Sequence, residues 1–172
     1  MLNETRNIAL IGMPGCGKST IGKILAQTVN RPLADIDRLI EKAAGKSIPR
    51  IFTEDGEDTF RQIETRLLGE EAAKSGMVIA TGGGVVTRHE NLGCLRKNSI
   101  IIYLKRDLSE LITTDRPLSQ SKGIEMLAKQ RLPLYEEWSD CVIDIDKNHE
   151  KTVMRILEAI CLYNDPSAAQ AR

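Results

Sequence analysis

Short apolar runs rich in Ile and Val alternate along the chain with longer charged stretches, in which apolar residues recur at the spacing of one helix face. The apolar runs predict buried strands, because the strands of a parallel sheet are covered on both faces and therefore lack polar alternation. The charged stretches predict helices that cross from one strand to the next. This pattern favours an α/β fold built on one parallel sheet.

Five strands and six helices are predicted from the pattern. The strands are expected at Asn7–Ile11, Pro32–Ile36, Met77–Thr81, Ser99–Leu104 and Cys141–Ile145. The helices are expected at Lys18–Val29, Arg38–Ala44, Glu57–Ser75, Leu108–Thr114, Gly123–Glu137 and Glu150–Tyr163, with Gly45 and Gly76 as helix stops. Because no linker divides the chain, we expect a single domain over residues 1–163, followed by a disordered tail at 164–172.

The charge balance narrows the class of partner. The 24 Lys and Arg residues equal the 24 Asp and Glu residues, so the net charge gives no bulk attraction to nucleic acid or to an anionic membrane. Aromatic residues make up only 3% of the chain, too few for the base-stacking surface of a single-strand binder. With no long apolar run and no signal-like N-terminus, we expect a cytoplasmic protein that binds a small molecule, with no nucleic acid and no membrane partner.

A phosphate-binding loop is predicted directly after the first strand. The segment Gly12–Ser19 matches G-x-x-x-x-G-K-[ST] and opens a helix at Lys18. Glycines in such a loop let backbone N–H groups converge on phosphate oxygens, while the lysine reaches the β- and γ-phosphates and the Ser19 hydroxyl ligates Mg²⁺. The flanking strand and helix favour a nucleoside triphosphate site over the alternative, a Gly-rich turn without a ligand.

Two aspartates follow the second predicted strand. Asp35 and Asp37 are two positions apart, so their side chains point to the same side if the strand continues. Such a pair could hold a metal ion or accept a proton. The alternative is that Asp37 only caps a helix that begins at Arg38. The neighbouring phosphate loop favours the functional interpretation.

The third predicted strand ends in three consecutive glycines, Gly82, Gly83 and Gly84. Bare backbone at that place allows a ligand to approach closely. The alternative is a flexible loop. The position at the end of a strand favours the functional interpretation.

Four basic residues are candidates for contacts to an anion. Each of three has an ordinary alternative: Arg61 could pair with Glu64 on the same helix, Lys122 could be solvated, and Arg131 could lie on an exposed helix face. Arg116 stands in a segment that small kinases close over the nucleotide. A cation delivered by such a segment stabilises charge on the phosphoryl group in transfer.

Taken in order, these motifs resemble the shikimate kinase family, small P-loop phosphotransferases of the nucleoside monophosphate kinase type. The resemblance runs from about Asn7 to Tyr163. Gluconate and nucleotide kinases share the phosphate loop but lack the T-G-G-G element. The matching segments are Gly12–Thr20, Asp35-Ile36-Asp37, Ile51-Phe52, Gly56-Glu57, Phe60-Arg61-Gln62-Ile63-Glu64, Thr81-Gly82-Gly83-Gly84, Arg116-Pro117-Leu118 and Arg131-Leu132-Pro133-Leu134-Tyr135.

The resemblance implies a three-layer P-loop kinase fold, with a five-stranded parallel sheet flanked by helices and a short mobile lid at about residues 116–129. It implies an enzyme that transfers the γ-phosphate of ATP to the 3-hydroxyl of shikimate. The products are shikimate 3-phosphate and ADP, on the route to chorismate and the aromatic amino acids. It further implies Mg²⁺ as cofactor and a monomeric protein.

The resemblance also assigns site residues. Catalytic roles fall to Lys18, Asp37 and Arg116, with Asp37 as the candidate base. The metal would be held by Ser19 directly and by Asp35 through water. ATP contacts are expected at Gly12, Met13, Pro14, Gly15, Cys16, Gly17, Lys18, Ser19, Thr20 and Arg116. Shikimate contacts are expected at Asp37, Phe52, Phe60, Arg61, Gly82, Gly83, Gly84 and Arg131.

Two segments depart from the family pattern. The stretch between Leu108 and Arg116 is short and lacks the arginine that family members stack on adenine, and Asp146-Lys147-Asn148-His149 replaces a basic, Pro-containing loop. The alternatives are therefore another P-loop small-molecule or nucleotide kinase and a catalytically inactive nucleotide-binding module. A GTP-binding switch is disfavoured, because no Asn in the chain is followed by Lys and the guanine-reading N-K-x-D motif is therefore absent from the sequence.

Overall fold

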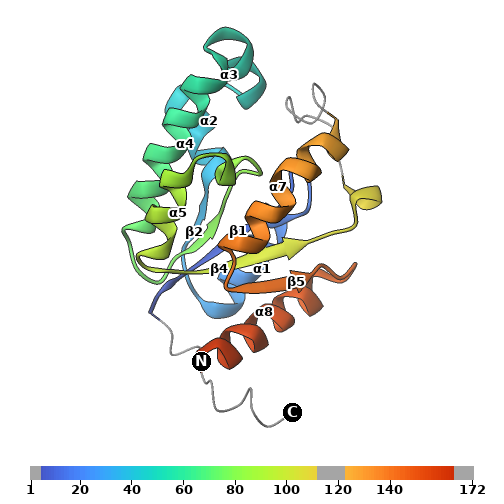
Figure 1. Ribbon diagram of the computed structural model, residues 1–172. Helices are drawn as coiled ribbons and strands as arrows, with labels where there is room; N and C mark the ends of the chain where they lie inside the picture. Colours follow the sequence, from blue (N-terminus) through green and yellow to red (C-terminus); the bar gives the residue numbers. More distant parts are fainter. Residues whose placement is uncertain (1–4, 112–122, 165–172) are drawn as a thin grey trace.

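One parallel sheet organises the protein (Figure 1). The computed structural model describes residues 5–111 and 123–164. The sheet has five strands in the order β2-β3-β1-β4-β5, and every pairing is parallel. The strands are β1 (Asn7–Ile11), β2 (Leu33–Asp35), β3 (Val78–Ala80), β4 (Ser99–Lys105) and β5 (Cys141–Asp144). The predicted α/β class and all five strands are confirmed.

Helices cover both faces of the sheet. They are α1 (Lys18–Val29), α2 (Ile36–Ala44), α3 (Ile48–Glu54), α4 (Gly56–Ala72), α5 (His89–Arg96), α7 (Ile124–Trp138) and α8 (His149–Asn164). Helices α1 and α8 contact each other and the strands from one side, while α5 and α7 contact β4 from the other (Figure 1). Helices α2 and α3 pack on α4 at one end of the molecule. None of the helices in the described part of the chain is long and apolar enough to cross a membrane.

Local sequence signals decide where β1 and α1 lie. Both elements have the predicted bounds, Asn7–Ile11 and Lys18–Val29.

The prediction that the second strand continues past Asp35 is wrong. Helix α2 begins at Ile36 instead, because the Asp35 side chain caps it by accepting a hydrogen bond from the Arg38 amide at 3.3 Å. The cap is therefore Asp35 rather than Asp37.

Two helices were not predicted from the apolar pattern. Helix α3 buries only Ile51, and α5 buries only three residues, so neither shows a clear apolar stripe. A 3-10 turn at Val85–Thr87 also went unpredicted. The predicted helix at Leu108–Thr114 is a 3-10 turn over Leu108–Glu110 in its first part, and its end lies outside the described residues.

The two predicted helix stops have different outcomes. Gly45 is the C-cap of α2 with a left-handed φ of 67°, as expected. Gly76 does not end a helix, because α4 already ends at Ala72. It turns the chain toward β3 with a φ of 72°, and its amide donates to the Thr5 carbonyl at 2.9 Å.

Candidate functional site

The phosphate loop curls at the carboxyl end of β1. Three of its glycines have positive φ angles, 149° at Gly12, 76° at Gly15 and 110° at Gly17. Gly12 also lies against the neighbouring strand, because a Cβ there would be 2.6 Å from the Leu104 carbonyl oxygen. Side chains would strain the loop at these positions, so its glycines fix a conformation in which backbone amides can face an anion.

Lys18 is held inside this loop and is only 6% exposed. Its ammonium donates to the carbonyls of Gly12 at 2.8 Å and Met13 at 2.9 Å. The Cys16 sulfur lies 3.8 Å away. An ammonium has three N–H donors, and the contact to the Cys16 sulfur is the longest of the three, so this N–H is the one that can turn to a phosphate oxygen at the loop.

The two aspartates occupy different elements. Asp35 ends β2 and caps α2, and it is buried. Asp37 lies in the first turn of α2, half-buried, with its Oδ1 atom 3.0 Å from where a Cβ on Gly82 would be. The structure therefore separates their tasks, since Asp35 faces the helix cap and Asp37 faces the glycine segment.

The glycine segment Gly82–Gly84 is a packed junction, so the flexible-loop alternative is wrong. All three glycines are buried, and each touches a different part of the site. A Cβ on Gly83 would be 2.7 Å from the Pro14 nitrogen of the phosphate loop, and one on Gly84 would collide with the Arg61 guanidinium. None of the three has a positive φ. Space for neighbouring side chains, rather than backbone torsion, is the reason for glycine here.

Arg61 is 5% exposed and pairs with a buried carboxylate. Its Nη1 donates to Glu64 Oε2 at 2.6 Å, and its Nη2 lies 3.5 Å from Glu57 Oε1. The ordinary alternative for Arg61, an ion pair with Glu64, is thus present. Burial raises the pKa of Glu64, against the opposing effect of the Arg61 charge. Arg61 Nε and Glu64 Oε1 are buried and have no hydrogen-bond partner among the described residues.

Arg131 is 3% exposed, so the alternative of an exposed helix face is wrong. It projects from α7, and its Nη1 donates to the Gly83 carbonyl at 3.1 Å. Burial lowers the pKa of Arg131, and the nearby Arg61 charge contributes in the same direction. Its Nε is buried without a partner among the described residues. The structure therefore brings two buried guanidinium groups, each with an Nε that lacks a partner among the described residues, to the same glycine segment, which is the arrangement that an anion would stabilise.

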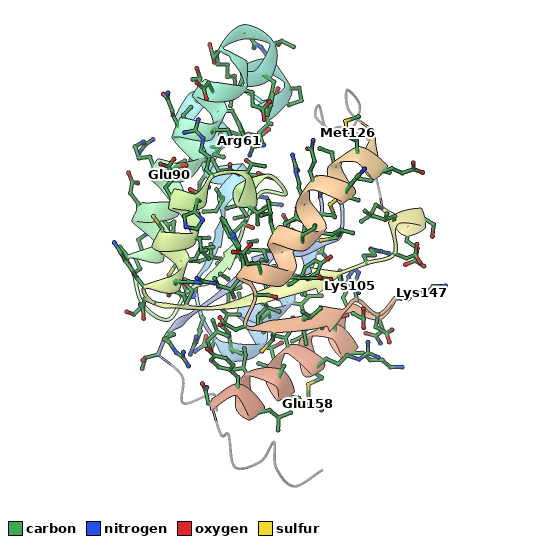
Figure 2. All side chains as sticks on the ribbon, viewed as in Figure 1. Arg61, Glu90, Lys105, Met126, Lys147 and Glu158 are labelled. Carbon is green, nitrogen blue, oxygen red and sulfur yellow. The ribbon has the colours of Figure 1, made fainter. Side chains whose placement is uncertain are left out.

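Figure 2 shows Arg61 beside the segment that leads from Gly84 into the 3-10 turn. The two predicted aromatic residues lie on the same side of the site. The rings of Phe52 and Phe60 are 4.7 Å apart, and the Arg61 guanidinium carbon is 5.0 Å from the Phe60 ring centre. Phe60 is buried and Phe52 is half-buried. The Phe52 and Phe60 rings therefore form an apolar surface next to the Arg61 cation.

Sequence reasoning missed Arg106. It follows β4 at the same edge of the sheet, and its Nη1 donates to the Cys16 carbonyl of the phosphate loop at 3.5 Å. Its Nε is 3.5 Å from Glu110 Oε2. The available signal was a basic residue directly after a buried strand. Arg116 and Lys122 lie outside the described residues.

The described residues contain no group of three or more His, Cys, Asp or Glu side chains that could hold a metal ion by themselves. A divalent cation at the phosphate loop would need oxygen atoms from a bound phosphate. This suits Mg²⁺, which binds through few protein ligands and substrate phosphates. The Ser19 hydroxyl and the Asp35 carboxylate supply oxygen donors of the type that Mg²⁺ prefers.

Comparisons with known proteins agree on one family. The family model described as shikimate kinase matches residues 14–161. A shikimate kinase from Marinomonas sp. is 38% identical over 90% of this chain and 91% of its own, and one from Buchnera aphidicola is 42% identical over 87% and 92%. The solved structure of a shikimate kinase from Acinetobacter baumannii in complex with shikimate is 34% identical, with a TM-score of 0.85, and covers 93% of this chain and 94% of its own.

Proposed function

The chain belongs to the shikimate kinase family, and from this premise we propose how its site works. The protein is an ATP-dependent kinase that acts on shikimate, so ATP and shikimate are its substrates. The γ-phosphate of ATP passes to the 3-hydroxyl of shikimate, and the products are shikimate 3-phosphate and ADP. Two buried guanidinium groups with unpartnered Nε atoms, next to a phosphate loop, are the observation that carries the assignment of the site.

In our proposal, ATP binds along the phosphate loop. The loop amides and the N-terminus of α1 receive the phosphates, and Lys18 extends one N–H to the β- and γ-phosphate oxygens. Arg116, outside the described residues, would add a cation at the transferring phosphoryl group. The proposed ATP contacts are Gly12, Met13, Pro14, Gly15, Cys16, Gly17, Lys18, Ser19, Thr20 and Arg116.

Mg²⁺ is the proposed cofactor of the phosphate loop. Ser19 would contribute its hydroxyl directly, and Asp35 would act through water. When bound, the cation would neutralise charge on the β- and γ-phosphates. Asp35 can take this part while it caps α2, because a carboxylate has two oxygen atoms and several lone pairs.

Shikimate is proposed to bind between α4, α7 and the glycine segment. Arg61 and Arg131 would receive its carboxylate, since both guanidinium groups are buried and aim at neighbouring glycines. Asp37 and the Gly82–Gly84 backbone would hold its hydroxyl groups, and Phe52 and Phe60 would line its ring.

Asp37 is the proposed base of the transfer. It would accept the proton of the 3-hydroxyl as the oxygen forms its bond to the γ-phosphorus and the bond from that phosphorus to the ADP oxygen breaks. In a loose transition state the carboxylate serves chiefly to orient the hydroxyl. Arg61 uses its Nη1 for Glu64, and its Nε, which has no partner among the described residues, would donate to the substrate.

The remaining features of the enzyme are proposals as well. We expect one kinase domain over residues 1–163 with a lid at about residues 116–129, of which residues 124–129 belong to the start of α7. We also propose a monomer in the cytoplasm that binds neither nucleic acid nor a membrane. The balanced charge of the chain supports the proposal that it binds neither nucleic acid nor a membrane.

A coupled assay of ADP release tests the function. The full chain with ATP and Mg²⁺ should release ADP with shikimate, and only at background rates with gluconate or nucleoside monophosphates. Release of ADP only when a nucleoside monophosphate is the acceptor would support the alternative of a nucleotide kinase. Absence of ADP release with all acceptors, together with measurable ATP binding, would indicate an inactive nucleotide-binding module.

A further inference from the structure

The Gly83 carbonyl is the meeting point of two buried donors. Arg131 Nη1 donates to it at 3.1 Å, and the Tyr135 hydroxyl donates to it as well. The two donors are four residues apart on α7 and therefore lie on the same helix face. A carbonyl oxygen has two lone pairs, so this pair of bonds uses its full accepting capacity.

Tyr135 is fixed in place by its surroundings. It is 0% exposed, and its ring stacks on Tyr103 of β4 with 5.2 Å between the ring centres. Burial raises the pKa of the Tyr135 hydroxyl, so the group stays a neutral donor. A side chain that is fully buried and packed against another ring can define the position of its hydrogen-bond partner.

The Gly83 peptide in turn lies between the phosphate loop and the side chains proposed to bind shikimate. Gly83 also packs closely against Pro14. Its neighbour Gly82 faces Glu64 and Asp37, and Gly84 faces Arg61. A shift of the Gly83 peptide would therefore move the backbone that faces the acceptor. The same shift would release one of the bonds that orient Arg131.

From this chain of contacts we infer that Tyr135 is a positioning residue for the acceptor substrate. Its hydroxyl fixes the Gly83 carbonyl, and so holds the Gly82–Gly84 backbone and the Arg131 guanidinium in the orientation that receives shikimate. Tyr135 itself does not touch the reacting atoms. The inference rests on the proposed binding of the shikimate carboxylate by Arg131.

Tyr135→Phe tests the inference, because it removes the hydroxyl and keeps the buried ring. We expect the KM for shikimate to rise about two- to tenfold, the range of one neutral hydrogen bond, while the KM for ATP stays within about twofold. The matched control is Tyr103→Phe, which removes the hydroxyl of the stacked ring. That variant should leave both KM values unchanged.

A double-variant cycle separates positioning from general loss of packing. If Tyr135 acts through Gly83 and Arg131, Tyr135→Phe should raise the KM for shikimate less in an Arg131→Ala background than in the wild type. Equal effects in both backgrounds would overturn the inference. An equal rise of both KM values in Tyr135→Phe, or no rise in either, would overturn it too.

Amide hydrogen exchange of the free protein gives a readout that does not depend on turnover. The amides of Val85 and Thr87 donate to the carbonyls of Gly82 and Gly84. Their exchange should become faster in Tyr135→Phe and stay at the wild-type rate in Tyr103→Phe. Unchanged exchange in Tyr135→Phe would refute the inference that the Tyr135 hydroxyl positions Gly83. Faster exchange in Tyr135→Phe, combined with no turnover of shikimate by the wild type, would mean that the proposed function alone has failed.

Discussion

The two halves of the site are built in opposite ways. The core of the phosphate-binding half is one consecutive segment, Gly12–Ser19, whose glycines and helix start define it locally. The acceptor half takes Asp37 from α2, Arg61 from α4, Gly82–Gly84 from the loop after β3, and Arg131 from α7. Only the fold brings these four segments together.

This difference has an energetic side. The acceptor half buries charged groups that depend on one another. Arg61 Nη1 donates to Glu64 Oε2 at 2.6 Å, and the Arg61 charge contributes to the lowered pKa of Arg131. Removing one partner of a buried pair leaves an uncompensated charge, which costs about 3–5 kcal/mol. Substitutions in the acceptor half should therefore lower stability as well as activity. Those in the phosphate loop should act mainly on activity.

The strongest test of this contrast is Lys18→Ala. Loss of the ammonium that stabilises charge on the phosphates should lower kcat about 10³-fold. Thermal unfolding should still show one cooperative transition, because among the described residues Lys18 bonds only to atoms of the loop itself and the glycines keep the backbone conformation of the loop. The control Lys23→Ala removes an exposed lysine of α1 and should keep wild-type kcat. A Lys18→Ala protein that unfolds below the assay temperature would break the contrast.

Asp37→Asn tests the acceptor half at the reacting hydroxyl. An amide cannot accept the proton, so kcat with saturating shikimate should fall about 10²-fold. The paired variant Asp35→Asn keeps a good helix cap and should instead raise the Mg²⁺ concentration needed for half-maximal rate. Steady-state kinetics with varied Mg²⁺ distinguish the two aspartates. Identical profiles for both variants would contradict their separate roles.

Arg131→Ala should raise the KM for shikimate about 10- to 100-fold, as expected for loss of a charged hydrogen bond to the substrate. The KM for ATP should change little. The free energy of unfolding should also fall by about 1–3 kcal/mol, because Arg131 is buried and its bond to the Gly83 carbonyl is lost. Arg96→Ala, an exposed arginine of α5, is the control for both measurements. If the KM for shikimate is unchanged, the carboxylate binds elsewhere.

The smallest expected effect concerns pH. Burial raises the pKa of Glu64 in the folded protein above its ordinary value of 4.5, which applies to the unfolded chain. At a pH between the unfolded-state pKa and the raised folded-state pKa, the folded state therefore binds more protons than the unfolded state. This contribution to stability is present at low pH and is lost as the pH rises through the raised value. Denaturant unfolding at several pH values above about 4.5 should show this loss in the wild type relative to Glu64→Gln, which cannot ionise. Parallel pH profiles for the two proteins would contradict it.

Prediction from the sequence succeeded where the signal is local. The bounds of β1 and α1 follow from an apolar run, glycines and the start of a helix. It failed at α3 and α5, whose short segments bury too few residues to show a period. It also failed at Ile36, which was predicted to end the second strand, because Asp35 is the last residue of β2 and also caps α2 by accepting a hydrogen bond from the Arg38 amide.

Within the site, the sequence by itself determined the phosphate loop, the order of the strands along the chain and the candidate residues on each. Only the tertiary structure decided that Arg61 is both an ion-pair partner and a buried candidate ligand, and that Tyr135 and Arg106 contact the site. It also decided that Gly82–Gly84 must be small, because Glu64 and Asp37 lie against Gly82, Pro14 against Gly83 and Arg61 against Gly84. The physical reason is that local motifs depend on backbone torsion and spacing, whereas packing depends on segments far apart in the chain.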